Sequence, residues 1–447
     1  LASWGERLNF PKGEHTEFKY YSPEMLEYCK QDVRITRKVA QTLEIEAKKF
    51  SSRSYELERK VRAIVDQQEK NGFYFNLYEA IPLLAGLEDE LHILEDKAQE
   101  LFKPTEVKLV TKTKYIPFNI GSRKQIAERL MKRGWKPTHY TDKGNVIVSE
   151  EILSKINMPE AEMFSRYFLL QKRTGLLKAW IKACEDDDRV RGRVMTLRTV
   201  TGRMAHNSPN MAQVPAVYSP YGKECRALWT VSNPDTHTLI GTDASGLELR
   251  CLAHYMDDPD FTNEVVNGDI HTANMKAAGL TDRDQSKKFI YSFLYGAGAT
   301  KIGKVVGGNA NRGYQLIDTF LSNMPKLKKL RDDVLKWSKD GTIPALDGRR
   351  LHIRSPHAAL NTLLQGAGAI ICKQWLVHIT DHIRGSGVDA KLVASIHDEY
   401  QFEVAKKDAE EFGQITKDAM KDTEKTLKVK CPLDCDFKIG TTWKETH

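Results

Sequence analysis

The pattern of apolar and polar residues predicts an arm of long helices in the first 188 residues. In the segment 77–102, apolar residues such as Leu87 and Leu91 recur at helical spacing among many charged residues. Ser22 is a favourable N-cap and Pro23 suits a first helical position, so a helix is predicted to begin there. Further helices are predicted over 22–49, 55–69, 122–133 and 158–184, with a basic link rich in Thr and Val at 103–115.

From residue 189 the pattern changes to short extended runs bounded by Gly, Pro and Asn. The order of elements is a strand, a long helical insert, and then a helix followed by a hairpin. This order allows acidic residues far apart in sequence to meet on one sheet, and it predicts the α+β class. The expected strands are 238–242, 391–396 and 400–404, and the expected helices are 247–256, 283–295 and 356–384.

Chain length, net charge, cysteine content and the absence of long apolar runs narrow the class of protein further. The chain has 447 residues, which favours roughly two to four subdomains rather than one core. Its formal charge of +8 is spread along the chain, as in surfaces that follow a polyanion. Seven scattered cysteines do not indicate a disulfide framework, so a reducing compartment is expected. No apolar run approaches a membrane span, and the polar first residues show no signal peptide, so we expect no membrane association.

Two aspartates occupy places where a strand end exposes a side chain. Asp243 follows the apolar strand 238–242, and Asp398 lies at the tip of the predicted hairpin. Carboxylates brought together in this way repel each other, and Mg²⁺ bound by them and by substrate phosphates relieves the repulsion. An Asp at a turn is also common without any catalytic role. The neighbouring Glu399 is either an assisting ligand or a solvated hairpin residue.

A predicted helix combines two cations and two aromatic rings on one face. Arg283, Lys287, Tyr291 and Tyr295 recur every four residues, which is a drift of only about 40° per step. The cations near the helix N-terminus suit a triphosphate and the rings suit a base, while Gly296 allows a close approach. An amphipathic helix with ordinary surface charges is the alternative.

Taken together, these segments resemble the conserved motifs of family A DNA polymerases, most of all the replicative type of bacteriophages. D-A-S-G-L-E-L-R at 243–250 resembles motif A, the string at 283–296 resembles motif B, and H-D-E at 397–399 resembles motif C. The segments 201–215 and 354–365 add two family-like strings in the right order. The resemblance covers nearly the whole chain and implies a right-hand polymerase, with an antiparallel palm sheet and helical thumb and fingers. The implied domains are an exonuclease remnant at 1–50, thumb at 51–188, palm at 189–256 and 351–447, and fingers at 257–350.

The resemblance also implies roles for individual residues. Two Mg²⁺ ions, replaceable by Mn²⁺, would be held by Asp243, Asp398 and the backbone carbonyl of Ala244. Lys287 would donate a proton to the pyrophosphate leaving group, and Glu399 would assist catalysis. The implied nucleotide contacts are Arg283, Lys287 and His271 at the triphosphate, Tyr291 beside the sugar, Tyr295 near the templating base, and Glu248 against a 2′-hydroxyl. The implied DNA contacts are Arg203, Asn361 and Gln365 in the minor groove and His397 at the primer terminus.

The function implied is extension of a primer 3′-hydroxyl on a DNA template with dNTPs, in phage genome replication in the host cytoplasm. Tyr291, where some members have Phe, predicts that dideoxynucleotides are accepted. A single-subunit RNA polymerase is one alternative, against which Glu248 argues. A non-catalytic DNA-binding subunit of a replication complex is another, against which the paired carboxylates argue.

Two segments depart from the pattern of the family. Tyr28 and Asp32 match the last exonuclease motif, but the earlier exonuclease carboxylates have no counterpart here. One carboxylate cannot assemble a two-metal site, so no proofreading is expected from this chain alone, and a separate polypeptide could supply the rest. The thumb insertion that binds thioredoxin in a phage relative is short here, at 103–118, so a thioredoxin clamp is doubtful.

Overall fold

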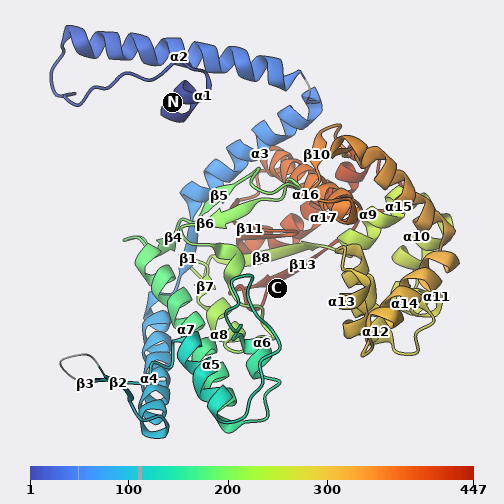
Figure 1. Ribbon diagram of the computed structural model, residues 1–447. Helices are drawn as coiled ribbons and strands as arrows, with labels where there is room; N and C mark the ends of the chain where they lie inside the picture. The colour runs from blue at the N-terminus through green and yellow to red at the C-terminus, as the bar shows by residue number, and fades with distance from the viewer. Residues whose placement is uncertain (49, 109–112) are drawn as a thin grey trace.

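A computed structural model describes residues 1–48, 50–108 and 113–447. It consists of a helical arm, a helical lower body, a central sheet and a body of short helices beside the sheet (Figure 1). The arm contains α1 (Ala2–Arg7) and α2 (Pro23–Ala47) and lies apart from the remainder of the chain in Figure 1. The Ser22 side chain accepts a hydrogen bond from the Met25 amide, and Pro23 is the first helical residue, so the predicted start of α2 is confirmed.

The helical lower body is built around two long antiparallel helices. α3 (Ser52–Asn71) leads into α4 (Leu77–Leu101), which packs along α7 (Pro159–Ala183), and α5 (Arg123–Lys132) and α6 (Glu150–Leu153) cover α7. The predicted helices are therefore present to within a few residues. The predicted link at 103–115 is not simply irregular, because β2 (Thr105–Lys108) pairs with β3 (Thr113–Ile116). Its Thr- and Val-rich composition favours this extended pairing.

The central sheet has four antiparallel strands in the order β11-β12-β8-β13. Successive residues of β8 face opposite sides of the sheet, so Ile240 packs with the helices α16 and α17 and Leu239 packs with the small sheet β4-β1-β7. Both faces are thus covered, and β12 is buried along its whole length. The strands of the two sheets are β11 (Ala390–Ile396), β12 (Glu399–Ala405), β8 (His237–Ala244), β13 (Cys435–Gly440), β4 (Arg189–Val190), β1 (Phe73–Phe75) and β7 (Trp229–Thr230).

A helical insert separates β8 from the hairpin β11-β12. It begins with α9 (Leu247–Met256), and Figure 1 shows the following short helices gathered on one side of the sheet. The 28-residue α16 (Ala359–Ser386) then returns the chain to the sheet, where α17 (Ala409–Leu427) lies beside it. The helices of the insert are α10 (Pro259–Val266), α11 (Ile270–Ala278), α12 (Arg283–Leu294), α13 (Ala299–Val305), α14 (Ala310–Asn323) and α15 (Pro325–Trp337).

Smaller elements connect these bodies. Two further strand pairs lie outside the central sheet: β5-β6 comes before β8 in sequence and β9-β10 lies between α15 and α16. α8 leads into β7. Within the described residues, no helix is both long and apolar enough to cross a membrane. The elements are α8 (Gly222–Ala227), β5 (Arg193–Met195), β6 (Ala205–Asn207), β9 (Thr342–Pro344), β10 (Arg350–His352) and the 3₁₀ turns Met211–Gln213, Ser338–Asp340, Pro356–Ala358 and Lys406–Asp408.

Candidate active site

The two aspartates singled out in the sequence meet at one end of the central sheet. β8 continues past Thr242, so Asp243 lies inside the strand rather than after it, and its register partner on β12 is Glu399. Asp398 occupies the tight turn between β11 and β12, as predicted. The Ala244 amide donates a hydrogen bond of 3.1 Å to the Asp398 backbone carbonyl, which fixes the turn against β8.

Both carboxyl groups are electrostatically unfavourable as a pair of anions. The protein around Asp243 excludes much of its water and, together with the charges of Asp398, Glu399 and Asp436, raises its pKa to about 7. Burial is also the main cause that raises the pKa of Asp398 above its usual range, with Glu248 contributing. A divalent cation at this position would remove the repulsion.

Asp436 is a third carboxylate that the sequence analysis missed. It lies on β13 directly opposite Asp243, and the Ser245 hydroxyl donates to its Oδ2 at 3.0 Å. Its signal in the sequence is only the alternation D-C-D-F-K at 434–438, which becomes informative once β13 is paired with β8. Strand pairing across about 190 residues brings it to the site.

Glu399 is not a solvated hairpin residue, which corrects one of the two readings of the sequence. Its side chain is 7% exposed and accepts hydrogen bonds from Trp443 Nε1 at 2.5 Å, Gln401 Nε2 at 2.6 Å and His447 Nδ1 at 2.7 Å. Burial alone would raise the pKa of Glu399, but the bonds from His447, Trp443 and Gln401 outweigh it and hold the pKa below the usual range. Both carboxylate oxygens are therefore occupied by protein donors.

The predicted cationic helix exists and presents its charges beside α11. The Arg283 guanidinium forms two hydrogen bonds with Asp269, Nε to Oδ2 at 2.9 Å and Nη2 to Oδ1 at 3.0 Å, while Lys287 is exposed. Asp269 also caps α11 through the amides of His271 and Thr272. Burial lowers the pKa of His271, and the nearby charges of Arg283 and Lys287 lower it further, so these three residues share one positive region.

The aromatic part of α12 faces the acidic pair. Tyr291 and Tyr295 lie with ring centroids 6.3 Å apart, and the Tyr295 hydroxyl donates to Glu248 Oε1 at 2.8 Å. Burial, and then the charges of Glu248 and Asp398, raise the pKa of Tyr291. Arg203 Nη2 lies 3.5 Å from the same Glu248 oxygen. The structure therefore brings the residues predicted on three separate segments to one region.

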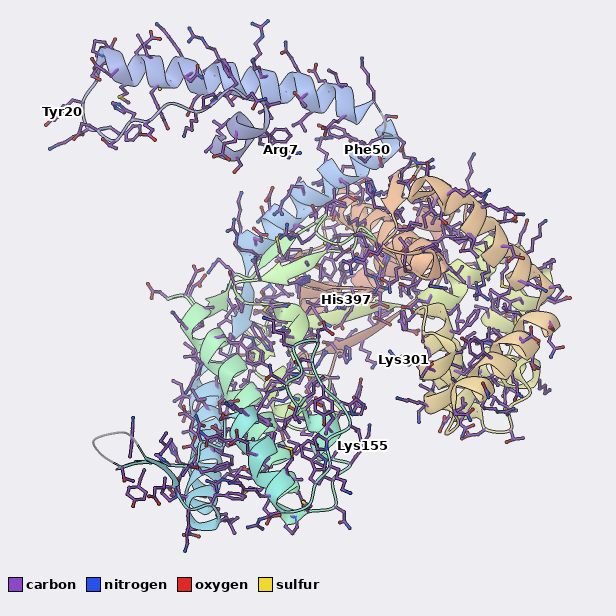
Figure 2. The ribbon with its side chains drawn as sticks, in the orientation of Figure 1. Arg7, Tyr20, Phe50, Lys155, Lys301 and His397 are labelled. Atoms are coloured by element: carbon purple, nitrogen blue, oxygen red, sulfur yellow. The ribbon has the colours of Figure 1, made fainter. Side chains whose placement is uncertain are left out.

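The remaining predicted residues fall into two groups: some lie around the same region, and the others lie in the arm. His397 has a left-handed backbone (φ 58°) and lies in the middle of the molecule in Figure 2, where with Arg203 and Asp398 it lines a small cavity. Asn361 donates to the Leu294 carbonyl at 3.1 Å, and Gln365 follows it by one turn of α16. Tyr28 and Asp32 are one turn apart on α2 in the arm, where Lys12 lies 3.6 Å from Asp32 and over the Tyr28 ring.

The donor set at this end of the sheet suits a metal ion that also binds substrate. In the described parts of the chain, no group of three or more His, Cys, Asp or Glu side chains is arranged to hold a metal. Two neighbouring carboxylates are nevertheless a donor set that Mg²⁺ can use when substrate phosphates and water complete its shell, and the cation would relieve the strain that raises their pKa values. Asp243 and Asp398 fit a magnesium site that is completed by a ligand, rather than a closed protein cage.

Comparison with known proteins identifies the family. The model of "DNA polymerase family A" matches residues 88–445, which include every residue of the acidic pair and of the cationic helix. The chain belongs to DNA polymerase family A. This confirms the resemblance seen in the five sequence motifs.

Relatives of this family A chain include phage enzymes. It is 39% identical over 379 residues to the DNA-directed DNA polymerase of Enterobacteria phage T3, covering 75% of this chain and 54% of the relative. It is also 39% identical over 382 residues to that of Escherichia phage T7, with the same two coverages. The chain therefore spans about half the length of the curated relatives it matches.

A solved structure supports the fold of the family A chain. The polymerase domain of Pol1 from M. smegmatis, in complex with DNA primer-template and dNTP, superposes with a TM-score of 0.77 at 19% identity. The match covers 87% of this chain and 70% of that chain. At this identity the likeness concerns the fold, and it confirms the predicted α+β right-hand class.

Proposed function

We propose that this chain catalyses template-directed extension of a DNA primer with dNTPs. The observation that carries the proposal is the meeting of Asp243 and Asp398 at the end of the sheet, within the electrostatic reach of Tyr291 on the cationic helix α12. The relatives in phages T3 and T7 bear the name DNA-directed DNA polymerase, and the M. smegmatis structure contains primer-template and dNTP. These names support the same substrates here.

The residues would divide the work of nucleotidyl transfer. Asp243 and Asp398, with the Ala244 carbonyl, would hold two Mg²⁺ ions, or Mn²⁺ in their place, which when bound supply activation of the 3′-hydroxyl and charge neutralisation at the triphosphate. Lys287 would hold a proton near the leaving pyrophosphate, and it is exposed and free to approach a ligand. Glu399 would support the turn that carries Asp398 rather than act as a ligand, because three donors occupy it.

Nucleotide binding would require one rearrangement on α12. Arg283 is paired with Asp269, and this exposed pair contributes little to stability. A triphosphate carries more charge than one carboxylate, so it would draw Arg283 away from Asp269 and toward His271 and Lys287. The nucleotide would thus be bound at the N-terminal end of α12, where the helix dipole also favours anions.

The sugar and base would be selected by neighbouring side chains. Glu248 is held by Tyr295 and Arg203, so its carboxylate has a fixed place from which to exclude a 2′-hydroxyl. This favours a DNA polymerase over the single-subunit RNA polymerase considered above. Tyr291 would lie beside the sugar and Tyr295 near the templating base. The minor-groove contacts would come from Arg203, Asn361 and Gln365, with His397 at the primer terminus.

The same proposal assigns each body of the fold to a polymerase subdomain. The described residues of 51–188 would form the thumb, 189–256 and 351–447 the palm around the central sheet, and 257–350 the fingers. Residues 1–50 would be an exonuclease-related arm. In outline this division is supported by Figure 1, where the arm, the lower helices, the central sheet and the short helices beside it form separate groups.

A primer-extension gel tests the proposal. Wild type should extend a labelled primer on a DNA template with Mg²⁺ and dNTPs, and should do so poorly with ribonucleotides. Asp398→Asn should reduce the rate by roughly 10²–10³ or more, since it removes a preorganised charge from the site. Asp381→Asn, an exposed aspartate on α16, is the matched control and should behave as wild type. A folded wild type that binds primer-template without extending it would favour the DNA-binding subunit instead.

A further inference from the structure

A buried cluster of four charged side chains lies behind the candidate active site and has no part in the chemistry proposed above. Lys373, Arg349 and Asp347 are 1%, 6% and 3% exposed, and the side chain of Glu58 is 12% exposed. Lys373 Nζ donates to both oxygens of Glu58, at 2.7 and 2.9 Å. Arg349 donates to Glu58 at 2.6 Å and makes a bidentate pair with Asp347, with Nη2 to Oδ2 at 2.6 Å. The charges of the two cations and the two anions in the cluster therefore cancel.

The cluster joins three elements that are distant in sequence. Glu58 comes from α3, Lys373 from the middle of α16, and Asp347 and Arg349 from the turn between β9 and β10. The Ser51 hydroxyl, at the start of α3, also donates to the Asp347 carbonyl. Burying four charges requires desolvation of each, and apolar packing of equal volume is often at least as stable. The cluster is therefore better explained by the geometry that it fixes than by stability.

What the cluster holds is the loop that carries Arg203. The third hydrogen bond of Lys373 goes to the Thr196 carbonyl at 2.8 Å, where this loop begins. At its other end, Gly202 has a left-handed backbone (φ 78°), and a Cβ there would lie 3.3 Å from Nη1 of Arg349. The loop is closed internally, because the Thr199 hydroxyl donates to the Arg203 carbonyl at 3.1 Å. Lys373 thus holds the start of this short loop by a hydrogen bond, and the Arg349 side chain lies close to Gly202 near its other end.

Lys373 also borders the candidate active site. With Arg203, His397 and Asp398 it lines the small cavity beside the catalytic turn, while Glu58 and Arg349 line a separate groove. Lys373 therefore shares a cavity with Arg203 and is also bonded to the start of the loop that carries it.

We propose that Lys373 and Glu58 are positioning residues that hold Arg203 in place for its contact with the minor groove of the primer end. The proposal rests on the proposed function, because it takes the Arg203 contact from there. Arg203 is a long side chain whose guanidinium lies 3.5 Å from Glu248. Its reach to a base therefore depends on where the loop begins and ends.

The test combines protein variants with a modified primer. The variants are Lys373→Met, Glu58→Gln, the double variant Glu58→Gln/Lys373→Met and Arg203→Ala. The modified primer ends in 3-deazaguanine, which lacks the minor-groove nitrogen acceptor but pairs normally. In wild type the modification should lower kcat/KM about 10- to 100-fold, as expected for one lost hydrogen bond to a charged group. In Lys373→Met the natural primer should already show that loss, and the modification should add less than about threefold.

The double variant keeps the test independent of folding. Removing one charge leaves its partner buried and can unfold the chain, whereas the double variant removes one charge of each sign and leaves Arg349 with Asp347. It should melt near the wild-type temperature and still be insensitive to 3-deazaguanine, as Arg203→Ala should be. A stable double variant that keeps the full wild-type sensitivity would overturn the proposal, and so would a wild type that ignores the modification. In both cases wild type still extends the natural primer, so the proposed function is judged separately.

Discussion

Replacing Glu399 distinguishes a metal ligand from a residue that supports the catalytic turn. Glu399→Ala removes a carboxylate that is 7% exposed and accepts bonds from Trp443, Gln401 and His447. Glu399→Gln keeps the shape and one acceptor oxygen but removes the charge. The two variants therefore separate the packing of the side chain from its charge.

The structure gives the size of each effect. The alanine variant leaves buried donors on Trp443 and Gln401 without an acceptor, so the free energy of unfolding should fall by about 3–5 kcal/mol. Glutamine can still accept from Trp443, so its loss should be about 1–2 kcal/mol. Because Glu399 is one of the charges that raise the pKa of Asp243, its neutralisation should ease ionisation of Asp243. The Mg²⁺ concentration for half-maximal extension should therefore change by less than about threefold.

Urea unfolding and Mg²⁺ titration of primer extension measure the two effects on the same preparations. Asp398→Asn is the comparison for a true ligand, and its metal requirement or its maximal rate should change by roughly 10²-fold or more. If Glu399→Gln shifts the Mg²⁺ requirement as strongly as Asp398→Asn while unfolding like wild type, the assignment of Glu399 to a supporting role is wrong.

Three further predictions concern the side chains of His206, Tyr400 and Tyr291. His206 is 8% exposed and burial lowers its pKa to about 4, so its contribution to stability is present above pH 6.5 and is lost as the pH falls towards 4. Between about pH 7.5 and about pH 5, the free energy of unfolding from urea titration should therefore change by about 2 kcal/mol more unfavourably in wild type than in His206→Gln, and equal changes in the two proteins would contradict this. Tyr400→Phe removes a buried hydroxyl that donates to the Cys372 carbonyl at 2.8 Å and should cost about 1–2 kcal/mol in the same assay, whereas Tyr218→Phe, which is 93% exposed, should cost nothing measurable. Tyr291→Phe should increase discrimination against dideoxynucleotides about tenfold or more, measured by competition with dNTPs on one template, and an unchanged ratio would contradict the role given to its hydroxyl.

The sequence by itself determined the elements and the central chemistry. The spacing of apolar residues located α4, and the four-residue spacing of two cations and two tyrosines located α12, to within a few residues, because helical periodicity is a local property. Asp243 and Asp398 could be paired in advance because the order of elements places a strand end and a hairpin tip at one edge of a sheet. The five motifs pointed to the family that the comparison then showed.

Some local predictions were incomplete because pairing is not local. The segment 103–115 is predicted as a basic link, and residues 109–112 of it lie outside the described residues. The pairing of β2 with β3 escapes the prediction because these strands have few apolar residues and are defined by cross-strand hydrogen bonds. The partner of Arg283, Asp269, lies on another helix, so the sequence pattern that predicted a phosphate-binding cation gave no sign of this pair.

Only the tertiary structure decided what surrounds the site. It placed Asp436 opposite Asp243, buried Glu399 beneath Trp443, and joined Lys373 to Glu58 across 315 residues of sequence. In each case the sequence shows which residues carry a charge. The effect of that charge depends on desolvation and on partner residues contributed by other elements. Those quantities are set by packing, because the energy of a buried charge depends on distance and on the water excluded around it, and neither follows from the order of residues.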